Sequence, residues 1–275
     1  MTELKQARNE INAIDKEMAK LFEKRMEVCA RVAAYKQSVG LSIRDTERET
    51  ELINRNREFI NDAEINSYYI RFIRGVIDLS CAYQLRIMEG LKVICCGGDG
   101  KGITAARSMF PEARLIETAS AEEAYNAVTS GEPDIAVLPL EDEQTASLLF
   151  DGELFVNQVT DVEVNGEKRR FAALSRVKNA PLSNRKREDE NFILMFTVQN
   201  ETGALAQVLN IIGAHGYNLR SLRSYHRREL LWNHFFYLEA EGSVETSDGR
   251  ELMQELSALC ARLKLVGTYY SNNTV

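Results

Sequence analysis

The sequence has little of what membrane, secreted or nucleic-acid-binding proteins need. No apolar run approaches the roughly 18 residues that a membrane span requires. The first 20 residues are rich in charged side chains, which argues against a secretory signal peptide. The formal net charge is −7, so no general basic surface is available for nucleic acid or a membrane. We therefore expect a cytoplasmic protein with neither a nucleic-acid nor a membrane partner.

Cysteine, histidine and proline are also scarce. The five cysteines show no metal or redox spacing, so we expect reduced thiols. We expect no metal site from the three histidines, which are His215, His226 and His234. None of the four prolines precedes Pro111, which favours long uninterrupted helices in the first third of the chain.

Apolar residues recur every three or four positions between residues 2 and 38, which predicts one long helix with a buried seam. The seam consists of Ile11, Ile14, Met18, Leu21, Val28, Val32 and Tyr35. Such a helix exceeds the usual length in globular proteins, so we expect it to pack against another chain as well as its own. Two further helices are predicted, one starting near Asp45 and carrying Leu52, Ile53, Phe59 and Ile60, and one over residues 64–89.

Polar residues interrupt these apolar stripes. Arg25 lies on the first seam, while Ser80 and Gln84 lie within a second stripe that contains Tyr69, Phe72, Ile73, Val76 and Ile87. A buried charge or amide is costly unless something pairs with it, and no carboxylate lies in register on the same face. The pattern therefore predicts a site for a small anionic molecule inside a helical bundle.

The pattern changes at residue 91. Strands at 91–96, 114–117 and 135–140 alternate with helices at 104–109 and 121–130, which predicts a small parallel sheet. A strand pair follows at 153–164 and 170–175, joined by the turn Asn165-Gly166. The glycine-rich turn 97–102 lacks both nucleotide-binding fingerprints, because Lys101 is followed by glycine and Ile103 stands where a third glycine is needed.

A polar linker at 179–191 separates this region from the last one. Residues 192–275 read strand, helix, strand, strand, helix, strand, the ferredoxin-like order. The predicted strands are 193–198, 219–225, 233–239 and 263–270, and the helices are 204–215 and 248–262. The fold class expected is thus multi-domain α plus α/β, with domains at 1–90, 91–178 and 192–275.

The first segment resembles the all-helical chorismate mutases. Eight polar residues stand in that family's order and spacing: Arg8, Arg25, Lys36, Asp45, Arg48, Glu49, Ser80 and Gln84. The resemblance implies an intertwined helical dimer that rearranges chorismate to prephenate. Because that step is unimolecular and pericyclic, it needs no metal, cofactor or nucleophile, only a cavity that holds the reactive conformer and stabilises developing charge.

The resemblance also implies a role for each of the eight residues. Arg8 and Arg25 would bind the two carboxylates of chorismate, for which the planar guanidinium fork is suited. Lys36 and Gln84 would donate hydrogen bonds to its ether oxygen. Glu49 and the backbone near Asp45 would take the ring hydroxyl, while Arg48 and Ser80 would complete the polar lining.

Helix geometry adds a constraint on Arg8. Arg25 and Lys36 are 11 positions apart, about three turns, so they share a face. Arg8 precedes Arg25 by 17 positions, which places it roughly 100° away and ~25 Å along the axis. One straight helix cannot bring all three to one ligand. We therefore expect Arg8 to serve a site on another subunit, in a homodimer or higher homo-oligomer with composite sites.

Taken one at a time, these residues also have plainer readings. Asp45, Arg48 and Glu49 could be an ordinary helix start with intrahelical pairs. Arg8 alone could be solvated, and Lys36 could simply interact favourably with the helix dipole near a helix C-terminus. Arg25, Ser80 and Gln84 are harder to explain this way, because they interrupt apolar stripes.

Segments two and three resemble the prephenate dehydratase and ACT regulatory parts of fused mutase–dehydratase proteins. The first-lobe motif is present at residues 136–141, although Asp142 follows where the family has asparagine. The family's Thr-Arg-Phe motif, whose threonine is thought to be catalytic, corresponds to Arg169-Arg170-Phe171. Arg169 follows Glu141 by only 28 positions, too few for a second lobe. We therefore expect a truncated lobe without dehydratase activity.

The ACT-like segment keeps one family motif and alters another. Asn200, Gly203, Ala204, Leu205 and Asn218 correspond to the family's phenylalanine-binding interface. In the second motif, arginine at 223 and tyrosine at 225 replace a glutamate and an arginine. Binding of an amino-acid effector is therefore altered or lost, and the segment could serve for dimerisation alone.

The leading hypothesis is a chorismate mutase of aromatic amino acid biosynthesis (phenylalanine and tyrosine) with an appended ACT module. One alternative is a bifunctional chorismate mutase/prephenate dehydratase. Another is a non-catalytic amino-acid sensor whose helical segment only dimerises, although such a bundle would not need polar residues in its stripes.

Overall fold

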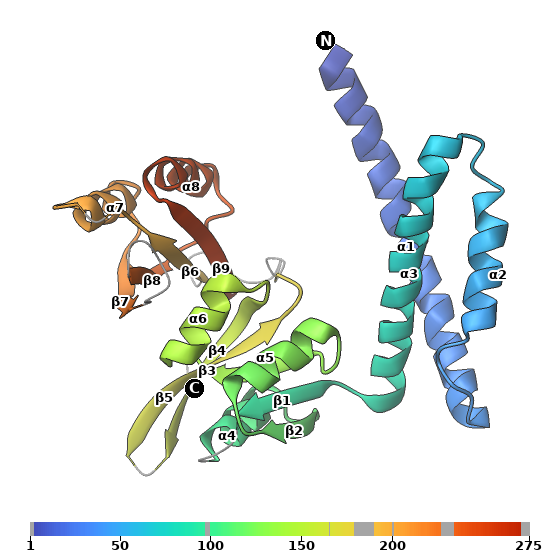
Figure 1. The fold of residues 1–275 in the computed structure, drawn as a ribbon, viewed down its shortest axis with the longest axis horizontal. Coiled ribbons are helices and arrows are strands. Elements are labelled where there is room, and N and C mark those ends of the chain that lie inside the picture. Colours follow the sequence, from blue (N-terminus) through green and yellow to red (C-terminus); the bar gives the residue numbers. More distant parts are fainter. Residues whose placement is uncertain are drawn as a thin grey trace. The chain divides into compact units, whose positions relative to one another are not determined.

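The chain was analysed as a computed structural model, which describes residues 3–96, 100–164, 166–178, 190–199, 201–226 and 234–270 (Figure 1). It divides into two compact units, Met1–Gly90 and Leu91–Val275. The glycine turn at 97–99, Asn165, most of the predicted linker (179–189) and Asn200 lie outside the described residues. In the described part, no helix is both long and apolar enough to cross a membrane.

The first unit consists of the three predicted helices: α1 (Glu3–Val39), α2 (Thr46–Arg57) and α3 (Ala63–Glu89). The prediction for α2 was too long at its C-terminus. The helix ends at Arg57, so Phe59 and Ile60 follow it, and Phe59 is 72% exposed.

Side-chain caps and glycines explain where these helices begin and end. The Asp45 carboxylate accepts a hydrogen bond from the Arg48 backbone N–H at 3.0 Å, which caps α2 as predicted. Asp62 caps α3 in the same way, accepting from the Glu64 N–H at 2.8 Å. Gly90 follows α3 with φ 79°, a left-handed conformation that glycine adopts without strain.

The core of the first unit lies along α3 and is small. Its buried residues are Ile43, Ile73, Ile77 and Cys81. Ala33 is the single buried residue of α1, whereas most of the predicted seam is exposed: Ile11 56%, Ile14 57%, Met18 44%, Leu21 64%, Val28 47%, Val32 40% and Tyr35 64%. The expectation of a buried seam is therefore wrong for the isolated chain, because α2 and α3 offer too little surface to cover a helix of 37 residues.

The second unit alternates strands and helices. Its first half contains β1 (Lys92–Cys96), α4 (Lys101–Met109), β2 (Arg114–Thr118), α5 (Ala121–Ser130), β3 (Ile135–Pro139), α6 (Glu143–Asp151), β4 (Phe155–Val164) and β5 (Glu167–Ser175). The second half contains β6 (Glu190–Thr197), α7 (Ala204–Ala214), β7 (Leu219–His226), β8 (His234–Glu241), α8 (Ser247–Leu259) and β9 (Arg262–Tyr270). All were predicted from the sequence except α6.

Among the described residues of this unit, one mixed sheet of nine strands has the order β2-β1-β3-β5-β4-β9-β6-β8-β7. The first three strands are parallel, as predicted, and β5 joins β3 in the antiparallel sense. The last four strands have the order of a ferredoxin-like βαββαβ arrangement. The two halves meet at β4 and β9, where Val156 pairs with Gly267. A Cβ at Gly267 would lie 2.1 Å from the Val156 carbonyl oxygen, so glycine is required there.

The sheet curls around a core that both halves share. This core includes Leu138 of β3, Leu174 of β5, Met195 of β6 and Phe235 of β8, each fully buried. The curl also brings Arg223 of the edge strand β7 into an ion pair with Glu141, directly after β3. The predicted boundary at 179–191 thus falls inside one compact unit, and an independent domain at 192–275 stays a prediction.

Candidate active site

A pocket of about 430 Å³ opens between the three helices of the first unit. Seven of the eight residues predicted to bind a small anion line it: Arg25, Lys36, Asp45, Arg48, Glu49, Ser80 and Gln84. They come from α1, the start of α2 and α3, which lie far apart in the sequence. The structure therefore brings together residues that the sequence pattern could only place on separate helices.

The two cations from α1 are half-buried and already oriented. The Arg25 guanidinium donates to the Ser80 hydroxyl and to the Val76 carbonyl oxygen at 3.4 Å, both through Nη1. Lys36 Nζ donates to the Ile43 carbonyl oxygen at 2.6 Å. A guanidinium has five N–H donors and an ammonium has three. Both groups therefore retain donors for a ligand.

The polar residues of α3 are buried, as their position in an apolar stripe predicted. Ser80 is 3% exposed and Gln84 is 7% exposed. Gln84 Nε2 donates to the Ser80 carbonyl oxygen at 3.2 Å, but its Oε1 has no partner among the described residues. Leaving a buried acceptor without a hydrogen bond costs about 1–3 kcal/mol. The free protein bears this cost at Gln84, and a ligand that donates to Oε1 would relieve it.

The first turn of α2 supplies the acidic side of the pocket. Glu49 has a side chain 23% exposed, and its Oε1 accepts from the Cys81 thiol at 3.8 Å. Arg48 is exposed and pairs with Glu51 at 2.8 Å, as expected if it only forms an ion pair within the first turns of the helix. Burial, followed by the charge of Glu49, raises the pKa of the Cys81 thiol, so this group stays protonated.

Arg8 does not join this group. It is exposed on α1 and lies outside the residues that line the pocket. Sequence reasoning missed the apolar part of the lining and both thiols: Cys29, Val32, Ile43, Leu52, Ile77 and Cys81. Their spacing carried a usable signal, since Cys29 follows Arg25 by one helical turn and Cys81 directly follows Ser80.

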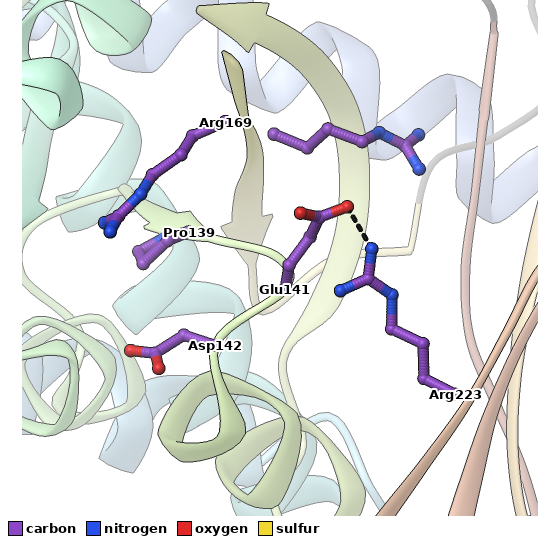
Figure 2. Close-up of a pocket in the computed structure, with 6 residues that line it drawn as sticks. Pro139, Glu141, Asp142, Arg169 and Arg223 are labelled. Atoms are coloured by element: carbon purple, nitrogen blue, oxygen red, sulfur yellow. Dashed lines mark hydrogen bonds and ion pairs between the residues drawn. The ribbon is translucent and has the colours of Figure 1, made fainter. Parts of the chain in front are cut away.

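A second, smaller pocket of about 300 Å³ lies in the second unit, between the end of β3, β5 and β7 (Figure 2). Its lining is strongly charged and consists of Pro139, Glu141, Asp142, Arg169, Arg170 and Arg223. Figure 2 shows Glu141 and Arg223 joined across this pocket. Three of the positions at which the sequence departs from the dehydratase and ACT patterns (142, 169 and 223) therefore meet in one place.

Arg170 leaves the pocket wall to join a buried network. Its guanidinium binds the fully buried Glu239 carboxylate twice, at 2.7 and 3.0 Å, and donates to the Tyr269 hydroxyl at 3.0 Å. Burial alone would favour the protonated form of Glu239. The hydrogen bonds from Arg170 and Tyr269 outweigh it and lower the pKa of Glu239.

The predicted effector residues lie around the start of α7 and the start of β7. Gly203 precedes α7 with φ 88°, and Ala204 and Leu205 form its half-buried first turn. Asn218 is exposed and donates to Glu241 at 3.1 Å. Within the described ranges, no three histidine, cysteine or acidic side chains lie close enough to hold a metal ion.

Comparison with known proteins finds similar proteins for both units. Residues 7–85 match the family described as chorismate mutase type II. The bifunctional chorismate mutase/prephenate dehydratase of Buchnera aphidicola subsp. Schizaphis graminum (strain Sg) is 22% identical over 369 aligned positions, which cover 97% of this chain and 96% of the relative. The alignment is longer than the 275 residues of this chain, so the relative carries residues that have no counterpart here.

Two solved structures share the mixed α/β fold. The prephenate dehydratase of Streptococcus mutans matches with a TM-score of 0.56 and 23% identity, over 66% of this chain and 98% of that one. The prephenate dehydratase of Arthrobacter aurescens in complex with L-Phe matches with a TM-score of 0.59 and 14% identity, over 66% and 90%. The first unit therefore matches the chorismate mutase type II family, the second has the fold of prephenate dehydratases, and the whole chain is similar to fused chorismate mutase–prephenate dehydratase proteins.

Proposed function

We propose that this protein is a chorismate mutase, an isomerase that rearranges chorismate to prephenate in aromatic amino acid biosynthesis. The observation that carries the proposal is the convergence of seven predicted polar residues on one pocket of about 430 Å³ in the domain matched at 7–85. A pocket of this volume is large enough for a small ligand such as chorismate.

The pocket supplies what the rearrangement needs. The remaining donors of Arg25 bind a carboxylate, while Ser80 and Val76 hold the guanidinium in place. Lys36 and the second N–H of Gln84 donate to the ether oxygen, where negative charge develops as its bond to carbon breaks. Glu49 accepts from the ring hydroxyl. Every group is fixed by a contact within the chain, so little reorganisation is needed when charge develops.

The site is completed by a second copy of the chain. A dicarboxylate needs a second cationic partner, and Arg8 lies outside the pocket of its own chain. The exposed apolar stripe of α1 supports dimerisation, because a monomer rarely leaves so many large side chains in water. In a homodimer the stripe is buried, and Arg8 of each chain enters the site of its partner subunit.

The second unit has lost dehydratase activity. At Arg169 a bulky cation occupies the position that resembles the catalytic threonine, and the pocket beside it is lined by the Glu141–Arg223 ion pair. The residues of the Buchnera relative that are missing here support the loss of half of the cleft. The alternative, a bifunctional enzyme, is favoured by the bifunctional relatives, which align with nearly the whole chain.

The last four strands form an ACT-type module with altered regulation. Their ferredoxin-like order and the left-handed Gly203 before α7 support this reading. Arg223 is engaged with Glu141, and the Tyr225 hydroxyl donates to the Glu141 carbonyl oxygen at 3.5 Å. The altered motif thus contacts its own chain, and we expect phenylalanine to bind weakly or not at all.

The mutase proposal is tested by incubating the purified protein with chorismate in the presence of a chelator and measuring prephenate. We expect turnover in the wild type, and a loss of ~10²–10³ in kcat for Lys36→Ala and for Gln84→Ala, by analogy with other oxyanion donors. A wild type that binds amino acids but does not consume chorismate would instead support the non-catalytic sensor. Full activity in both variants would refute the assignment.

A further inference from the structure

Arg44 lies beside the mutase pocket without lining it, and it joins two helices. It stands in the loop before α2, and its Nη2 binds Asp78 Oδ1 of α3 at 2.6 Å. Its other terminal nitrogen, Nη1, is 3.5 Å from Glu49 Oε2 of α2. One guanidinium therefore bridges a carboxylate at the pocket and a carboxylate on the outer side of α3.

The Glu49 carboxylate is held from both sides. Arg44 approaches Oε2, and the Cys81 thiol donates to Oε1 at 3.8 Å. Cys81 stays protonated because burial and the nearby Glu49 charge raise its pKa, so it remains a donor rather than a competing anion. Arg44 stays charged for the opposite reason, since Asp78 and then Glu49 raise its pKa. The two contacts together define one orientation of the carboxylate.

Packing alone does not fix this orientation. None of the residues of α2 is fully buried, and the helix contributes only the half-buried Leu52 and Ile53 to the core of the first unit. A site that binds by hydrogen bonds tolerates about 0.5 Å of misplacement, so a weakly packed helix needs an added polar anchor. The bridge from Asp78 through Arg44 to Glu49 is such an anchor.

We propose that Arg44 is a positioning residue of the mutase site: it holds the Glu49 carboxylate toward the ring hydroxyl of chorismate, and Asp78 holds Arg44. The inference rests on the proposed function and extends it to residues that do not touch the substrate. An arginine is suited to this position because its planar fork reaches two carboxylates at once, whereas a lysine ammonium is a single compact point.

The test is a double-mutant cycle on mutase kinetics. Arg44→Ala should lower kcat/KM about tenfold, mainly through KM, and about tenfold corresponds to 1.4 kcal/mol. In a Glu49→Gln background the same substitution should change kcat/KM less than about twofold, because the group that Arg44 positions is already neutral. Arg44→Lys should recover part of the loss, and Asp78→Asn should cost about threefold, since it removes the support of Arg44 alone.

Arg55→Ala is the matched control. Arg55 pairs with Glu51 at 3.2 Å on the outer face of α2, and its side chain is 54% exposed against 56% for Arg44. It does not line the pocket, so its removal should leave kcat/KM within about twofold, as for an exposed ion pair. Thermal unfolding of each variant shows whether the fold is kept. If Arg44→Ala does not fold, the cycle is run with Arg44→Lys and Asp78→Asn.

The outcomes separate this inference from the proposed function. A wild-type protein that does not convert chorismate refutes the proposed function, and the role of Arg44 with it. An active wild type in which the Arg44 and Glu49 effects simply add would overturn the positioning role alone. The same conclusion would follow if Arg44→Ala were no more harmful than Arg55→Ala.

Discussion

At the scale of single residues, the number of partners decides how a buried polar group is used. Glu239 is fully buried and is bound by Arg170, Tyr237 and Tyr269. Gln84 is nearly as buried, yet its Oε1 has no hydrogen-bond partner among the residues that the structure describes. A fully satisfied group such as Glu239 stabilises the fold, whereas Gln84 keeps both its second N–H and its Oε1 acceptor available for a ligand.

Glu239→Gln should destabilise the second unit by about 3 kcal/mol, because it leaves the Arg170 guanidinium without its bidentate partner. The effect depends on pH. The pKa of Glu239 is lowered on folding, so its contribution is present above its unfolded pKa, near 4.3, and is lost as pH falls through the folded value. Urea unfolding of both proteins between pH 3 and pH 7 measures this difference.

Glu245→Gln serves as the control, since Glu245 pairs with Lys178 at 2.6 Å but is 42% exposed. An exposed pair contributes about 0–1 kcal/mol, and its removal should have little effect at any pH. A difference between wild type and Glu239→Gln that stayed constant down to pH 3 would contradict the linkage to this carboxylate.

Of these two kinds of buried polar residue, the sequence predicted the kind at the pocket but not the kind in the sheet. Ser80 and Gln84 were predicted to be buried because a polar residue inside an apolar stripe is visible in a single helix. Glu239 was not, because its main partner Arg170 is 69 positions away on another strand. The pairing depends on how the sheet curls, and no local pattern reports that.

At the scale of elements, α1 is longer than its own chain can cover. It spans 37 residues, and its single buried residue is Ala33. A helix exposed along its apolar stripe is stabilised mainly by what packs on that stripe, since propensity alone contributes little. The length of α1 and the position of Arg8 outside the pocket both fit the homodimer proposed above.

Arg8→Ala and Lys36→Ala test this arrangement together. Each homodimer should be nearly inactive, because every site lacks one group. After co-expression, half of the dimers are mixed, and half of the sites in these are intact, so about a quarter of wild-type activity should return. Activity no higher than in the two mutant homodimers, with mixed dimers verified by mass, would show that Arg8 does not act across the interface.

Helix and strand positions were predictable because they depend on local periodicity and caps. Such signals are present in α4 and α5, at the ends of the strands and at the Asp45 cap. The nine-residue α6 was missed, although Asp142 at its N-cap position is a residue type that commonly starts a helix. The contact between β4 and β9 was missed because it joins strands 111 positions apart at a single glycine, Gly267.

At the scale of the whole molecule, the two units differ in what their pockets can bind. The first holds a pocket with donors left over for a ligand, while in the pocket of the second Arg223 pairs with Glu141, and Arg170 pairs with the buried Glu239. Incubated with prephenate, the protein should form no phenylpyruvate above the uncatalysed rate. Mutase activity of the same preparation shows that the first unit is folded, and a cooperative unfolding transition in urea shows the same for the second.

Arg169→Thr extends this test. It removes the bulky cation but does not restore the second lobe of the dehydratase, so we expect no dehydratase activity. Saturable formation of phenylpyruvate by the wild type would show instead that the protein is bifunctional. If only the variant gained activity, Arg169 alone would account for the loss.

The position of β9 in the sheet has a consequence for how the protein is made. β9 is the last strand of the second unit to leave the ribosome, yet it lies between β4 and β6, which are made much earlier. Domains usually fold in the order of synthesis. Here the edges of β4 and β6 stay unpaired until β9 has been made, so the unit cannot complete its sheet, and is most prone to aggregate, before that strand emerges.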